Sequence, residues 1–142
     1  LQIIWFGGEP MLEIEIIQSL SEKLILLADS LKIPYTSGIY TNGYFLTEKN
    51  IRILEKCRVR TVRISVDGSQ ESHDRMRYLA GGQGTYRRIL ENLSIPTTLT
   101  YRIRCNMTKD NLNDFETLEN ELREIQKKSG NTIFLTAERM RV

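Results

Sequence analysis

The residues best suited to binding chemistry follow a short apolar run at positions 1–6. They are Gly7, Gly8, Glu9 and Pro10. Two glycines let a ligand approach the backbone closely, and a glutamate carboxylate can accept hydrogen bonds from an ammonium group. Pro10 suits the first turn of a following helix. The same residues also suit a tight strand-to-helix turn capped by the glutamate, so this motif alone leaves both interpretations open.

Polar residues occupy the same kind of position farther along the chain, where other predicted strands end. They are Asn42 after the run 35–40, Ser65 and Asp67 at the end of 59–66, and Arg104 and Asn106 near the end of 97–107. In parallel α/β folds, ligands bind at the carboxyl ends of the strands. We therefore expect these side chains to lie around one rim.

Apolar periodicity predicts the elements that position these residues. Strands are predicted over 1–6, 35–40, 59–66 and 97–107, and another begins at 133–136. Helices are predicted between them. The first carries an inward stripe of Ile17, Leu20, Leu24, Leu27 and Leu31. The second begins after Thr47 as N-cap, and the others lie over 70–77, around 86–93 and over 112–128. The alternation predicts an α/β fold with a parallel sheet and right-handed crossovers. About five strands are too few for an eight-stranded barrel, which leaves an open sheet or a partial (β/α) barrel.

Length and composition limit the classes of function. The 142 residues fit a single domain, 1–142, with no linker or repeat. A formal net charge of +2 gives no reason to expect a nucleic-acid partner, and no apolar run approaches the roughly 20 residues of a membrane span. The two cysteines, Cys57 and Cys105, are too far apart for a CxxC metal site. We expect a cytoplasmic protein without membrane contact.

Several motifs together resemble those of radical S-adenosylmethionine (SAM) enzymes. In chain order they are Gly7-Gly8-Glu9-Pro10, Thr41-Asn42-Gly43, Ser65-Val66-Asp67-Gly68, His73-Asp74-Arg75-Met76-Arg77, Gly82-Gln83-Gly84-Thr85-Tyr86, and Arg104-Cys105-Asn106-Met107-Thr108 with Asn111 beyond. Each is weak by itself, but their shared order is specific. The chain is most similar to the subgroup of anaerobic sulfatase maturases and peptide-modifying enzymes. The resemblance implies a partial (β/α) barrel and a peptide or protein substrate.

The resemblance also implies roles for single residues. Glu9, with the backbone of Gly7 and Gly8, would bind the methionine ammonium of SAM, and Ser65 its ribose or methionyl part. Arg77 would pair with the methionyl carboxylate, because a guanidinium matches a carboxylate bidentately. Arg104 and Asn106 would lie near the substrate or on the ribose side of the pocket. The remaining residues assigned to the cofactor pocket are Pro10, Asn42 and Asp67. In such enzymes a reduced [4Fe-4S] cluster cleaves SAM to a 5′-deoxyadenosyl radical.

One part of the family's pattern is missing. The C-x-x-x-C-x-x-C loop that holds the cluster does not occur, and the chain opens at Leu1 inside an apolar run. We therefore expect a fragment of a radical SAM core that is active only within a longer enzyme, with Cys57 and Cys105 as buried small hydrophobes. An unpaired first strand over 2–6 would favour self-association through its edge.

Two other classes of function remain open. The first is a non-catalytic, degenerate module that binds SAM or a peptide. The second is an unrelated nucleotide-binding α/β domain, but the glycine fingerprint of that class is replaced here by Gly-Gly-Glu-Pro. Two further expectations concern single side chains. We expect His73 to cap the short helix or hydrogen-bond a neighbouring loop rather than to act in catalysis. We expect solvated faces for the arginines at positions 58, 60, 63, 87 and 88.

Overall fold

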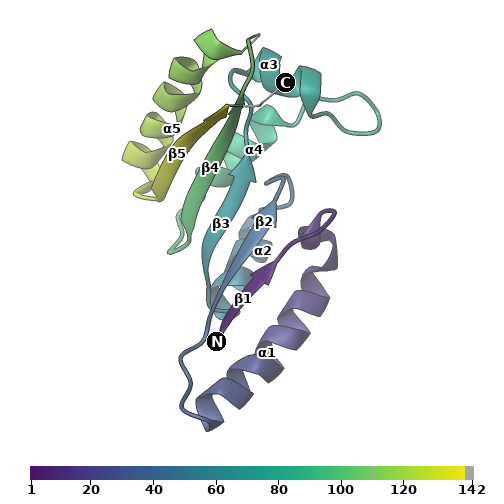
Figure 1. Ribbon diagram of the computed structural model, residues 1–142, viewed down its shortest axis with the longest axis vertical. Coiled ribbons are helices and arrows are strands. Elements are labelled where there is room, and N and C mark those ends of the chain that lie inside the picture. Colours follow the sequence, from purple (N-terminus) through teal and green to yellow (C-terminus); the bar gives the residue numbers. More distant parts are fainter. Residues whose placement is uncertain (110, 140–142) are drawn as a thin grey trace.

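A five-stranded parallel sheet organises the chain in the computed structural model, which describes residues 1–109 and 111–139. Its strands are β1 (Gln2–Trp5), β2 (Thr36–Thr41), β3 (Val59–Ser65), β4 (Thr100–Met107) and β5 (Thr132–Arg139). They lie in the order β1-β2-β3-β4-β5, and every neighbouring pair is parallel (Figure 1). The predicted α/β fold with a parallel sheet is confirmed.

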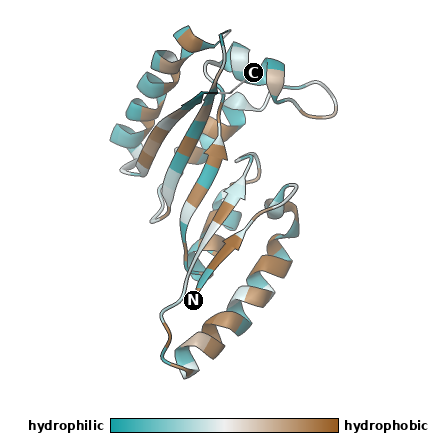
Figure 2. Cartoon of the chain, viewed as in Figure 1, coloured by the Kyte–Doolittle hydropathy of each residue, from teal (hydrophilic) through white to brown (hydrophobic). Residues whose placement is uncertain are grey.

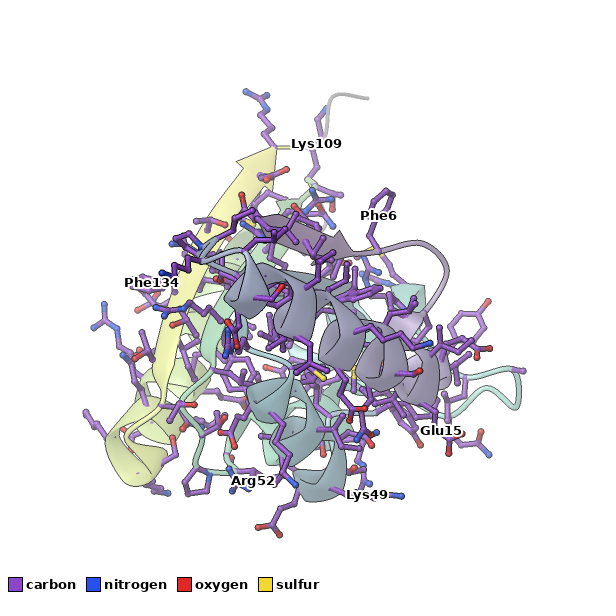
Figure 3. All side chains as sticks on the ribbon, turned by 90° about the horizontal axis from the view of Figure 1, so that it is seen from below. Phe6, Glu15, Lys49, Arg52, Lys109 and Phe134 are labelled. Atoms are coloured by element: carbon purple, nitrogen blue, oxygen red, sulfur yellow. The ribbon has the colours of Figure 1, made fainter. Side chains whose placement is uncertain are left out.

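Helical segments connect the strands. They are η1 (Pro10–Glu13), α1 (Ile14–Ser30), α2 (Glu48–Lys56), α3 (Gln70–Met76), α4 (Tyr86–Leu93), η2 (Leu112–Asp114) and α5 (Phe115–Ser129). Each crossover moves to the next strand in the same direction, so right-handed connections place the helices on one face of the sheet (Figures 1 and 3). A doubly wound sheet would reverse this direction and cover both faces. The strand order therefore supports the partial (β/α) barrel.

The hydrophobic core lies between the sheet and these helices. Strand side chains alternate between the two faces, and those directed at the helices are apolar and almost fully buried, for example Ile39, Val62 and Ile103. The intervening positions carry polar and aromatic residues. In register they form the row Tyr40, Arg63, Arg102 and Phe134, and beyond it the row Ser65, Arg104 and Thr136. The face away from the helices is therefore chemically distinct from the core.

The structure corrects the predicted inward stripe of α1. Ile17 is buried, but Leu20, Leu27 and Leu31 are 42%, 55% and 59% exposed. Ser21 and Ala28 are buried in their place, because small side chains let the helix backbone approach the sheet closely. Figure 2 shows hydrophobic residues along much of α1, so its apolar surface is wider than the strip that the sheet covers.

Local signals in the sequence account for several element boundaries. The side chain of Thr47 accepts a hydrogen bond from the backbone N–H of Asn50 at 3.3 Å, which confirms Thr47 as the N-cap of α2. Gly130, at a φ of 74°, ends α5 in the left-handed conformation that glycine adopts easily. Within the described residues, no helix is long and apolar enough to cross a membrane.

Candidate functional site

A cavity of about 430 Å³ lies on the face of the sheet away from the helices, near the carboxyl ends of the strands. Its size falls in the usual range for small-molecule sites, roughly 300–1,000 Å³. It brings together most of the residues that the sequence singled out, namely Gly7, Gly8, Glu9, Asn42, Ser65, Arg77 and Arg104. Figure 3 shows Phe6 beyond the end of β1 and Phe134 on β5, at the two edges of the sheet. Seven of the residues predicted at the rim thus line the same cavity.

Glu9 joins the loop after β1 to the end of β2. Its Oε1 accepts hydrogen bonds from the Thr41 hydroxyl at 2.6 Å and from the backbone N–H of Met11 at 3.0 Å. Its Oε2 accepts one from the backbone N–H of Asn42 at 2.7 Å. The capping interpretation of Glu9 is therefore correct. A carboxylate offers about four acceptor positions, so Oε2 retains capacity for a ligand donor.

The two glycines before Glu9 leave the rim open. Gly7 and Gly8 have φ values of 105° and 40°, which residues with side chains rarely adopt. A Cβ atom at either position would meet no atom within 4 Å. The glycines are therefore needed for the backbone turn rather than for packing, and their exposed backbone faces the cavity.

Asp67 organises the rim without lining the cavity. Its buried carboxylate accepts hydrogen bonds from the Nε of Arg77 at 2.6 Å and from the backbone and side-chain nitrogens of Asn106 at 3.1 and 3.0 Å. Asn106 is also buried, and neither it nor Pro10 lines the cavity. Because Asp67 uses only the Nε of Arg77, the terminal nitrogens of that guanidinium remain for another anion.

His73 is part of the support for α3 and α4. Its Nδ1 accepts a hydrogen bond from the backbone N–H of Asp67 at 3.2 Å, so the proton of the neutral ring lies on Nε2, which is 3.0 Å from the Thr85 hydroxyl. Burial lowers the pKa of His73 to about 4. These contacts agree with the expected structural role.

Asp74 links the same two helices. Its Oδ1 accepts hydrogen bonds from the backbone N–H groups of Thr85 and Tyr86 at 2.8 and 2.9 Å, at the start of α4. A Cβ atom at Gly84 would overlap this carboxylate. The aspartate of the H-D-x-x-R segment and the second glycine of the G-x-G-[ST]-[FY] segment therefore pack against each other. This contact is a physical reason for finding both residue types in this chain.

Several residues of the cavity were not predicted from the sequence. They are Tyr40, Arg63, Ile64, Arg102, Phe134, Thr136 and Glu138. Of the five arginines expected on solvated faces, four are exposed, namely Arg58, Arg60, Arg87 and Arg88, whereas Arg63 is half-buried and lines the cavity on β3. The strict alternation of β3 and β4 carried this signal, since Arg63 shares a face with Ser65, and Arg102 with Arg104.

The cysteines do not belong to this cavity. Cys57 and Cys105 are both free and buried, and burial raises the pKa of each thiol. Among the described residues, no three His, Cys, Asp or Glu side chains are grouped so as to hold a metal ion. The residues present here therefore do not fit an iron–sulfur cluster.

Comparison with known proteins agrees with the sequence motifs and the strand order. The model of the Radical SAM superfamily matches residues 1–96. The fold resembles native anSMEcpe, an anaerobic sulfatase-maturing enzyme, with bound AdoMet (SAM). The TM-score is 0.73 at 20% identity, over 97% of this chain and 37% of that chain. Native anSMEcpe with bound AdoMet and Kp18Cys peptide gives a TM-score of 0.69 at 21% identity, over the same shares of the two chains. No curated protein sequence matches this chain significantly.

Proposed function

The chain belongs to the radical SAM superfamily, and from this premise we propose that it forms the SAM pocket of an enzyme that modifies a peptide or protein. In this proposal the enzyme cleaves SAM reductively at a [4Fe-4S] cluster. The observation that carries the proposal is that Glu9, Ser65, Arg77 and Arg104, from four separate segments, line one cavity.

The chemistry of these side chains matches the charged groups of SAM. The free acceptor position on Glu9 Oε2 suits the ammonium group, and the exposed backbone of Gly7 and Gly8 allows close approach. The terminal nitrogens of Arg77 suit the carboxylate. Ser65 adds a hydroxyl for the ribose or the methionyl part. Pro10, Asp67 and Asn106 contribute by holding the rim rather than by contact with the cofactor.

The cluster would require thiolates from outside the described residues, because Cys57 and Cys105 are buried away from the cavity. The chain spans 37% of the length of the solved structure with the TM-score of 0.73. The activity, the peptide substrate and the cytoplasmic location of the whole protein are therefore all part of the proposal. The anSMEcpe structures solved with a bound peptide support the class of substrate.

The experiment uses the longest native protein that contains this chain. It is reconstituted anaerobically with iron and sulfide, supplied with a reductant and SAM, and assayed for 5′-deoxyadenosine. We expect cleavage in the wild type and in the control Glu15→Gln, an exposed glutamate six positions after Glu9. Glu9→Gln should lower the rate at least about tenfold, the loss expected for one charge-assisted hydrogen bond.

A non-catalytic SAM- or peptide-binding module is the second candidate, favoured by the poor fit of the described residues to a cluster. It predicts SAM binding without cleavage in the same protein. A preparation that assembles no cluster and forms no 5′-deoxyadenosine, yet binds SAM by calorimetry, would replace the enzyme by this module.

A further inference from the structure

Two of the arginines that line the cavity come from adjacent positions of neighbouring strands. Arg63 on β3 and Arg102 on β4 are direct partners in the sheet register, flanked by Tyr40 on β2 and Phe134 on β5. Neighbouring strands are about 5 Å apart, and side chains directly opposite one another interact. Arg63 is half-buried and Arg102 is exposed, so the cavity carries two guanidinium groups from adjacent strands.

The carboxylates around the cavity have other partners. Asp67 pairs with Arg77 at 2.6 Å, and Glu138 with Arg104 at 3.3 Å. The three hydrogen bonds of Glu9 go to Met11, Thr41 and Asn42. Within residues 1–109 and 111–139, neither Arg63 nor Arg102 has an ion pair or a hydrogen bond to a side chain. Two positive charges therefore face the cavity without compensation.

Stacking holds both guanidinium groups in place. The Cζ of Arg63 lies 5.1 Å from the centre of the Tyr40 ring, and the Cζ of Arg102 lies 5.1 Å from the centre of the Phe134 ring. The Arg63 side chain extends toward β2, where a Cβ at Gly38 would lie 3.5 Å from its Nη1, an ordinary van der Waals contact. Contacts with ring faces leave the N–H edges of a guanidinium free to bind oxygen atoms.

We propose that Arg63 and Arg102 form a binding site for an oxyanion, a carboxylate or phosphate group, of the substrate that this cavity receives. Planar guanidinium forks match the oxygens of such a group, and an oxyanion would supply the negative charge that the two arginines lack. The pair lies two residues before Ser65 and Arg104, about 7 Å farther from the carboxyl ends of the strands. This proposal rests on the proposed function, because the cofactor occupies the row nearer the carboxyl ends and leaves the other row to the substrate.

The test uses the 142-residue chain and follows the side-chain Nε–Hε signals of its arginines by NMR. Sodium acetate is the carboxylate probe and inorganic phosphate is the phosphate probe, each at constant ionic strength. We expect at least one probe to shift the Arg63 and Arg102 signals saturably, and the tighter probe identifies the group. Arg63→Gln and Arg102→Gln should each weaken binding about tenfold or more, and Arg88→Gln, an exposed arginine of α4, should leave it unchanged.

A linear response to both probes, or equal shifts at Arg88, would overturn the proposal. Titration with SAM separates this site from the cofactor pocket. If SAM shifts Arg63 and Arg102 and competes with the probe, the pair belongs to the cofactor and the assignment to the substrate is wrong. The readout needs neither a cluster nor SAM cleavage, so this proposal and the proposed function can fail independently.

Discussion

Single side chains at the rim have structural roles, and the proposed function gives some of them a ligand-binding role as well. Glu9 caps η1 and ties the loop after β1 to β2, while Oε2 retains an acceptor position toward the cavity. Asp67 holds both Arg77 and Asn106 through one buried carboxylate. Substitutions at such positions change stability and binding together, so each needs a variant that separates the two effects.

The first prediction concerns the stability contributed by Glu9. Glu9→Ala removes an acceptor of three hydrogen bonds and should lower the free energy of unfolding by about 2 kcal/mol. Glu9→Gln keeps one oxygen acceptor and should cost about half as much. Urea unfolding of both variants checks this, with Glu15→Ala as an exposed control. Equal stability of Glu9→Ala and the wild type would show that the cap contributes nothing.

The second prediction concerns the buried, neutral His73. Its pKa is about 4 in the fold and near 6.5 when unfolded, so the unfolded chain binds the extra proton between these values. The contribution of neutral His73 to the free energy of unfolding is then complete above pH 6.5, and it is lost as the pH decreases toward 4. The free energy of unfolding should drop by about 2 kcal/mol between pH 7.5 and pH 5.

Other groups titrate in the same range, so the His73 contribution is the difference from a variant. His73 is the only histidine. The free energy of unfolding of His73→Gln, measured with urea at several pH values, should lack the part of the pH dependence that is due to the imidazole. A pH dependence identical to that of the wild type would contradict a depressed pKa for His73.

At the scale of elements, α1 differs most from expectation. The sheet covers the narrow side of the helix that carries Ile17, Ser21 and Ala28, and the leucines on its flank stay exposed. Burial of an apolar side chain depends on what packs against it, and periodicity shows only that a helix has an apolar side.

The third prediction tests this arrangement of α1. Ile17→Ala opens a space in the core and should lower the free energy of unfolding by about 2–4 kcal/mol. Leu27→Ala removes an exposed side chain and should change it by less than about 0.5 kcal/mol. Urea unfolding measures both, and a cost at Leu27 equal to that at Ile17 would mean that the flank is covered in solution.

At the scale of the whole molecule, sequential strand order places all helices on one face and leaves the other for the cavity. The same order leaves β1 at an edge, paired only with β2 among the described strands. Close to this edge, Leu1 and Phe6 are exposed. An unpaired strand edge favours pairing with another chain.

The fourth prediction, self-association through β1, follows from that edge. Sedimentation velocity of the 142-residue chain should show a dimer that forms as concentration rises. Gln2→Lys places a charge at the exposed start of β1 and should shift the equilibrium toward monomer. Gln83→Lys, in an exposed loop, is the matched control. A monomer at every concentration would rule out association through the edge.

Most of the architecture and much of the rim could be predicted from the sequence. Alternating apolar periods determined the parallel α/β fold, because burial on one or two faces imposes a period on each element. The motif order indicated the family and Arg77, and strand ends located Gly7, Gly8, Glu9, Asn42, Ser65 and Arg104 at the same cavity.

Only the tertiary structure decided which neighbours these residues meet. It placed Asp67 and Asn106 behind the rim and made Arg63 and Arg102 neighbours in the sheet. It also packed α1 on the sheet through the side of the helix that carries small residues. The physical reason is that the side chains facing each other across strands β3 and β4 are 39 positions apart in the chain, as Arg63 and Arg102 are. Periodicity gives the face on which a residue lies, but strand order and register decide its partners.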